Sequence, residues 1–426
     1  MKIIVNPLQE ALPELLQRPV MDHAALQTVV QGVLDAVRTG GDKAVISYTK
    51  EFDGVTIDYL QVSEAEINEA SLSLEPALKE AMQLAAKNIR CFHEAQVNAT
   101  VTIETMPGVR CWRKAVGIDK VGLYIPGGSA PLFSTVLMLG IPAVIAGCKE
   151  IILCTPPSKD GSVNPAILYA ASVVGITRIY KIGGVQAIAS MAYGTESVPQ
   201  VYKIFGPGNQ YVTAAKQLVQ QNGVAIDMPA GPSEVCVLAD ESCNPAFVAS
   251  DLLSQAEHGP DSQVLLVSTS SKVVDEINEA LTAQLAVLPR KDIAQQALAN
   301  SKAIVVDSME QAIFIVNNYA AEHLIIACKN DEAIGEQITN AGSVFLGNYS
   351  PESVGDYASG TNHTLPTSGY ARAYSGVSVD SFVKKITYQK LTTAGLQAIG
   401  AAVETMAAAE GLDAHKNAIT IRLQSL

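Results

Sequence analysis

The sequence is short of charge, and basic charge is its scarcest kind. Only 17% of the 426 residues are charged while 48% are hydrophobic, which is the composition of a globular rather than a disordered protein. The formal net charge is -13, and no run of Lys or Arg exceeds the pair Lys384 and Lys385. The sequence therefore predicts neither a nucleic-acid partner nor a basic membrane-binding face.

Long apolar runs and paired cysteines are also missing. No run reaches the length of a bilayer span, and the opening residues MKIIVNPLQEALPELL lack the pattern of a signal peptide. The seven cysteines are scattered, odd in number and free of any C-x-x-C pair, as expected for reduced thiols. We expect a cytoplasmic protein that does not bind membranes, with most cysteines serving as small core residues.

The common fingerprints of nucleotide and zinc sites are absent as well. The sequence has no G-x-G-x-x-G, no Walker loop and no H-E-x-x-H. Glycine-rich turns nevertheless follow predicted strands in YIPGGSAP and KIGGVQA, and another lies in KIFGPGNQY before a helix. Open α/β sheets bind ligands in such loops, although a glycine-rich turn alone is more often an ordinary connection.

The pattern that is present is an alternation of strands and helices. From about residue 120, β-branched runs such as VGLYIP and EIILCTPP alternate with helix-length apolar segments, and the alternation recurs after residue 233. This pattern predicts parallel sheets, and the chain length allows two to four domains. We expect two α/β units in tandem, with mainly helical segments at both ends.

The stretch LLSQAEHGPDSQ predicts a helix with a polar end. An apolar stripe at helical spacing marks its buried face, and Gln255 and His258 lie on the opposite side, one turn apart. Gly259 and Pro260 should end the helix there. An amide oxygen and an imidazole nitrogen could meet one ion at this end, but for these two residues alone a histidine bonded to nearby carbonyls is the commoner structure.

Two further residues could complete an ion site. Asp356 lies in the long polar segment 347–369, whose length indicates either a functional or a disordered loop. His415 lies in EGLDAHKNAI, where a surface helix start is the plain alternative. With Gln255 and His258 they offer oxygen and nitrogen but no sulfur, a set suited to zinc or another first-row ion.

Glu322 and His323 form a second pair of interest, at the start of a predicted strand. A carboxylate beside an imidazole can divide the work of a general base. Neighbouring residues in a regular strand face opposite sides, so both reach one site only if the chain is irregular there. A solvated pair without function is the alternative.

Eight motifs taken together resemble one family. The motifs are YIPGGSAPLFSTVLMLG, IGGVQAIA, KIFGPGNQYV, DMPAGPSEV, LLSQAEHGPDSQ, AAEHL, SVGDYASGTNHTLPT and EGLDAHKNAI. In this order and spacing they closely resemble the histidinol dehydrogenases, the zinc enzymes of histidine biosynthesis.

The resemblance implies a role for each site residue. The implied zinc ligands, one ion per subunit, are Gln255, His258, Asp356 and His415, and the implied acid–base pair is Glu322 and His323. Substrate contacts would be completed by Ser233, His363 and Glu410. The implied NAD contacts are Tyr124, Gln186 and Asn209.

The resemblance also implies a fold and an assembly. We expect two incomplete Rossmann-like domains, the first of residues 26–122 with 233–377, which holds the metal and acid–base residues, and the second of 123–232, which holds the NAD contacts. Residues 1–25 would form an N-terminal helical element. Residues 378–426 would form a helical tail that completes the partner subunit's site in an intertwined homodimer, so that Glu410 and His415 act in trans.

The implied reaction oxidises L-histidinol to L-histidine through the aldehyde, with two NAD+ as co-substrates. Zinc would position the substrate, His323 would act as base and Glu322 would activate water. A cysteine nucleophile is the competing route for the second step, with Cys111 or Cys154 as candidates. A zinc-dependent amide hydrolase and a metal-stabilised binding protein are the rival functions that the residues leave open.

Overall fold

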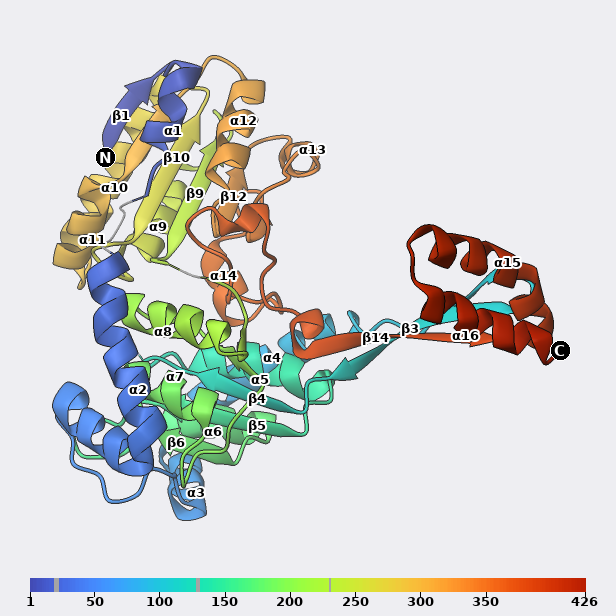
Figure 1. Ribbon diagram of the computed structural model, residues 1–426. Coiled ribbons are helices and arrows are strands. Elements are labelled where there is room, and N and C mark those ends of the chain that lie inside the picture. The colour runs from blue at the N-terminus through green and yellow to red at the C-terminus, as the bar shows by residue number, and fades with distance from the viewer. Residues whose placement is uncertain (19–22, 128–130, 230) are drawn as a thin grey trace.

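The computed structural model describes residues 1–18, 23–127, 131–229 and 231–426. The chain forms two bodies, each built on a parallel sheet, and an arm extends from the body that holds the second sheet (Figure 1). The expected α/β fold with two parallel sheets is confirmed. No helix among the described residues is long and apolar enough to cross a membrane.

The first body is a six-stranded sheet in the order β1-β11-β10-β9-β12-β13, parallel throughout. The strands are β1 (Lys2–Val5), β9 (Glu234–Ala239), β10 (Gln263–Ser268), β11 (Lys302–Val305), β12 (His323–Ala327) and β13 (Ser343–Leu346). One face packs against α9 (Pro245–Ala256), α10 (Ser271–Val287) and α11 (Lys291–Ala299). The other packs against α1 (Leu12–Leu15), α12 (Met309–Tyr319) and α13 (Asp331–Gly335). Helices on both faces explain why these strands are nearly continuous apolar runs.

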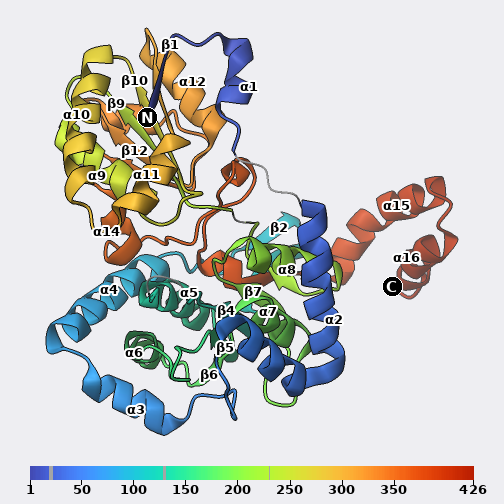
Figure 2. The ribbon, with the colours of Figure 1, turned by 90° about the vertical axis from the view of Figure 1, so that its left-hand side faces the viewer.

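The second body is a five-stranded parallel sheet in the order β6-β5-β4-β7-β8. Its strands are β4 (Lys120–Tyr124), β5 (Glu150–Thr155), β6 (Arg178–Lys181), β7 (Lys203–Phe205) and β8 (Ala225–Ile226). One face is covered by α3 (Glu64–Ser73), α4 (Pro76–Glu94), α5 (Phe133–Ile145) and α6 (Pro165–Val174). The opposite face is covered by α2 (His23–Tyr48), α7 (Gly184–Tyr193) and α8 (Gln210–Gln221) (Figure 2).

The N-terminal third packs differently from our expectation. Residues 26–94 lie mainly against the five-stranded sheet, since α2 buries Val30 and Leu34 in the same core as Tyr124. Their contact with residues 233–377 is made by α4, where the Asn88 amide donates to the Ala358 carbonyl at 2.9 Å. Residues 1–25 begin with a strand, β1, that joins the six-stranded sheet beside β11. Helical periodicity identifies a buried face, but it does not tell which sheet covers that face.

The arm combines a small sheet with two helices. Strands β2 (Thr102–Met106), β3 (Val109–Gly117) and β14 (Val383–Leu391) pair in antiparallel fashion in the order β14-β3-β2. They lead to α15 (Thr393–Ala409) and α16 (Asp413–Gln424), which project away from both bodies (Figure 1). The tail expected to be helical from residue 378 therefore starts with a short 3-10 helix, Val379–Phe382, followed by the strand β14, whose partner β3 lies more than 250 residues earlier in the chain.

Four of the seven cysteines are buried, as expected for small core residues: Cys154, Cys236, Cys243 and Cys328. Cys91 is exposed, and Cys111 and Cys148 are half-buried. All seven are free thiols.

The base of the arm is fixed by a stacked aromatic pair. Phe205 on β7 and Phe382, just before β14, have ring centroids 3.9 Å apart, and both side chains are fully buried. We expect Phe382→Ala to lower the free energy of unfolding by about 3 to 5 kcal/mol, because it leaves a cavity in a packed core. Chemical denaturation followed by circular dichroism measures this.

The matched control is Phe314→Ala, since Phe314 on α12 is 44% exposed. This change should cost less than about 1 kcal/mol. Equal losses in the two variants would contradict a structural role for the stacked pair.

Candidate active site

The end of α9 brings two predicted ligands to the space between the two bodies. The helix ends at Ala256, one residue after Gln255, and His258 follows the cap residue Glu257. Gln255 is buried, whereas His258 is exposed on the isolated chain. The prediction that the helix stops at this point is confirmed.

Glu322 and His323 lie where the chain passes from helix to strand. Helix α12 ends in a left-handed residue, Ala320 (φ 53°), and β12 begins at His323. Because the chain is irregular here, the Glu322 carboxylate comes within 3.7 Å of His323 Nδ1. Both side chains are buried, which excludes the alternative of a solvated pair.

Asp356 brings the long polar segment into the same site. It lies on α14 (Glu352–Tyr357), and its Oδ1 is 3.4 Å from His323 Nε2. Its backbone carbonyl lies 2.9 Å from Nδ1 of His363, whose Nε2 is 3.0 Å from the Thr135 hydroxyl on α5. The segment 347–369 is therefore an ordered part of the site, with contacts to both bodies.

Burial and charge shift the pKa values of this cluster. Burial raises the pKa of Glu322 to about 7. Burial lowers the pKa of His323, but the carboxylates of Glu322 and Asp356 outweigh this effect and raise it to about 10. Burial also disfavours ionised Asp356, yet the nearby His323 leaves the pKa of Asp356 below its usual value. Perturbed pKa values of this kind gather at functional sites.

Glu352 is a member of the cluster that the sequence analysis missed. It is almost fully buried and accepts a hydrogen bond of 2.8 Å from the Ser254 hydroxyl. The side-chain nitrogen of Gln255, once the amide is turned to face this carboxylate, donates to both oxygens at 3.2 Å. Burial raises the pKa of Glu352 to about 8. Its position four residues before Asp356, one helical turn away, is the signal that could have revealed it.

The predicted NAD contacts follow strand ends of the five-stranded sheet. Tyr124 ends β4, and its hydroxyl accepts the Gly184 N–H at 3.1 Å. Gln186 is fully buried in the first turn of α7, and exposed Asn209 caps α8 after β7. The ends of β4 and β7 flank the point where the strand order reverses, which is where doubly wound sheets bind ligands. Gln186 follows the edge strand β6, and the bond from Gly184 to Tyr124 links the start of its helix to the end of β4.

Ser233 is half-buried directly before β9, one residue from Glu234, which contacts both Glu322 and His323. It is thus at the edge of the cluster.

Two predicted site residues, Glu410 and His415, lie far from the Glu322, His323 and Asp356 cluster of their own chain. Glu410 caps the end of α15 and His415 lies in the first turn of α16, both exposed on the arm, and these helices project away from α14 (Figure 1). Within the described ranges, no three His, Cys, Asp or Glu side chains lie close enough together to hold a metal ion.

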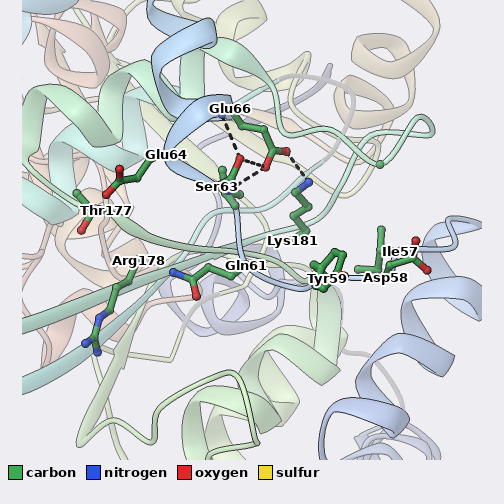
Figure 3. Close-up of a pocket in the computed structure, with 12 residues that line it drawn as sticks. Ile57, Asp58, Tyr59, Gln61, Ser63, Glu64, Glu66, Thr177, Arg178 and Lys181 are labelled. Carbon is green, nitrogen blue, oxygen red and sulfur yellow. Dashed lines mark hydrogen bonds and ion pairs between the residues drawn. The ribbon is translucent and has the colours of Figure 1, made fainter.

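A hollow of about 810 Å³ lies apart from these residues, beside β6 and the start of α3 (Figure 3). Its two cations are already paired, Lys181 with Glu66 at 2.5 Å and Arg178 with Glu150 at 2.7 Å. It contains none of the predicted site residues. We therefore place the candidate site at the buried cluster rather than in this hollow.

Comparisons with known proteins show the family to which the chain belongs. The family model described as Histidinol dehydrogenase matches residues 16–423. The histidinol dehydrogenase of Bacteroides thetaiotaomicron is 60% identical over 426 residues, all of both chains, and that of Xanthomonas axonopodis pv. citri is 55% identical over 97% of this chain and 96% of its own.

A crystal structure of histidinol dehydrogenase from Elizabethkingia anophelis superposes with a TM-score of 0.98, at 57% identity, covering 100% of this chain and 98% of that one. The resemblance seen in the eight motifs is thereby confirmed over the whole length, and the chain belongs to the histidinol dehydrogenase family.

Proposed function

We propose that this protein oxidises L-histidinol to L-histidine through L-histidinaldehyde, passing one hydride to each of two NAD+ molecules. The observation that carries the proposal is the buried group of Glu322, His323 and Asp356, in a chain of the histidinol dehydrogenase family. This group combines an imidazole with carboxylates in a site shielded from water, as proton transfer coupled to hydride loss requires.

His323 is the proposed base in both oxidation steps. It takes the hydroxyl proton of the alcohol as a hydride leaves the same carbon for NAD+. Glu322 then removes a proton from water as the water oxygen bonds to the aldehyde carbon, and protonated His323 returns its proton to the aldehyde oxygen, which gives a hydrate and a neutral imidazole. His323 takes a hydroxyl proton of the hydrate as the second hydride leaves, which yields the carboxylic acid, and the acid loses its proton to solvent. The 3.7 Å between Glu322 and His323 allows both to face one carbon.

The cluster fits a divalent cation in its chemistry. Three buried or largely buried carboxylates, Glu322, Glu352 and Asp356, surround one imidazole, whose Nε2 has no hydrogen-bond partner in the described part of the chain. We propose that Gln255, His258 and Asp356 hold a zinc ion, with His415 as fourth ligand. When bound, zinc would hold the substrate's amine and imidazole and, by neutralising Asp356, favour uncharged His323.

Neither candidate cysteine suits the competing route through a thiohemiacetal. Cys154 is fully buried on β5, and burial raises its pKa so far that a thiolate is disfavoured. Cys111 lies on β3, opposite Gln389 of β14, in the sheet of the arm. A water route through Glu322 needs no movement of these strands.

We further propose that the arm acts across a homodimer. It places Glu410 and His415 away from their own cluster, and it exposes several large apolar side chains that a second subunit would cover: Ile103, Met406, Leu412 and Ile421. Exposed apolar surface of this kind is typical of a subunit interface. His258, exposed on the single chain, would then meet the partner's tail.

The direct test follows NADH absorbance in the zinc-loaded protein with histidinol and NAD+. We expect about two NADH for each histidinol consumed, because a four-electron oxidation needs two hydride acceptors. Cleavage of histidinol amides without NAD+ would indicate a zinc hydrolase instead. A protein that zinc stabilises but that turns over neither histidinol nor its amides would be a binding protein.

The roles of the acid–base pair predict an unequal defect. Glu322→Gln should slow oxidation of added histidinaldehyde by about 100-fold, an effect of about 3 kcal/mol, and that of histidinol to the aldehyde by less than about tenfold. Single-turnover kinetics separates the two steps. The matched control is Glu332→Gln, at an exposed position on α13. Equal damage to both steps would remove Glu322 from the water-activating role.

The trans arrangement predicts complementation between two inactive variants. A random mixture of His415→Asn and Glu322→Gln subunits should recover about a quarter of wild-type activity, since half the dimers are mixed and each mixed dimer keeps one complete site. Purified mixed dimers should reach about half. Activity that stays at the level of the separate variants would show that both residues act within one chain.

A further inference from the structure

Asp53 is a carboxylate placed beside the predicted NAD contacts that has no role assigned so far. It ends a π-helical turn, Thr49–Asp53, and Gly54 (φ 71°) then turns the chain away. Its Oδ2 accepts a hydrogen bond of 3.4 Å from the Gln186 side chain. A Cβ atom on Gly183 would lie 3.3 Å from its Oδ1, so the carboxylate lies over the start of α7.

Three loops of the five-stranded sheet converge at this point. Pro156 follows β5, a Cβ atom on Gly183 after β6 would come within 2.6 Å of it, and a Cβ atom on Gly127 after β4 would overlap it. The loops can approach so closely only because both positions are glycine. Asp53 therefore stands at the carboxyl ends of the parallel strands, the edge at which such sheets bind nucleotides.

The polar groups here are mainly acceptors. Burial raises the pKa of Asp53 to about 6, and no cation in the described chain offsets it. Burial raises the pKa of Tyr124 to about 12, and the charge of Asp53 contributes to this. The side-chain oxygen of Gln186 is buried without a hydrogen-bond partner among the described residues. A ligand suited to this place brings donors, such as hydroxyl groups, rather than another anion.

The second strand of a dinucleotide-binding sheet commonly ends in an acid that holds the ribose hydroxyls of NAD. Here the strand beside central β4 is β5, which ends at Thr155 and is followed by Pro156 and Pro157, with no acid. Asp53 brings a carboxylate to the same edge from a different element.

We propose that Asp53 accepts a hydrogen bond from the 2′-hydroxyl of the adenosine ribose of NAD+, and that its charge excludes the 2′-phosphate of NADP+. The inference rests on the proposed function, because it assigns a specificity residue to that cofactor site.

The test compares NAD+, NADP+ and 2′-deoxy-NAD+ in steady-state kinetics with histidinol. In the wild type, loss of the 2′-hydroxyl should raise KM about tenfold. Asp53→Asn should raise KM for NAD+ about tenfold with kcat within about twofold, should reduce the preference for NAD+ over NADP+ about tenfold, and should no longer distinguish NAD+ from 2′-deoxy-NAD+. The matched control is Glu51→Gln, an exposed carboxylate in the same turn, which should behave as wild type.

Two results would overturn the inference. One is a wild-type protein whose KM for 2′-deoxy-NAD+ equals its KM for NAD+, and the other is an Asp53→Asn variant that keeps the full preference for NAD+ over NADP+. The first needs no variant and stands even if Asp53→Asn does not fold. Wild type that makes no NADH from histidinol would instead refute the proposed function, whereas normal turnover with unchanged cofactor preference refutes only the role of Asp53.

Discussion

The acid–base pair depends on hydrogen bonds with one residue of the neighbouring strand, Glu234. Its backbone N–H donates to the Glu322 carboxylate at 2.9 Å, and its carbonyl lies 3.3 Å from His323 Nδ1. Its own carboxylate is held by two parallel hydrogen bonds from Arg18, at 3.0 and 2.7 Å. Such bidentate pairs fix orientation as well as distance. The geometry of the site thus depends on an ion pair behind it.

That ion pair also connects distant parts of the chain. Arg18 lies over the Tyr319 ring at 3.9 Å and donates to the Tyr319 carbonyl, while the Ser368 N–H donates to Glu234 at 2.7 Å. The N-terminal segment, the end of α12 and the long polar segment therefore meet at one buried carboxylate. A buried charge that lost its partner would cost about 3 to 5 kcal/mol, so these segments are held together strongly.

Local spacing predicted the parts of the site that one element carries. Helical periodicity placed Gln255 and His258 at a helix end. Glu322 and His323 could share a site only if the backbone before their strand is irregular, and the left-handed residue at the end of α12 provides this. The roles of these residues came from the family motifs, since spacing alone left commoner alternatives open. Glu234, Asp53 and the sheet that covers α2 were not predicted, because each depends on packing between segments far apart in sequence.

The strand β1 has a consequence for how the chain folds. The five-stranded sheet is complete at residue 226, but β1 at residues 2–5 pairs only with β11 at residues 302–305. During synthesis the first strand must therefore wait for almost 300 residues, about 15 to 60 s at usual rates of translation. Residues 23–226 can condense around their own sheet in that time. The body that holds the acid–base pair is the last to close, and its closure requires the N-terminus to return.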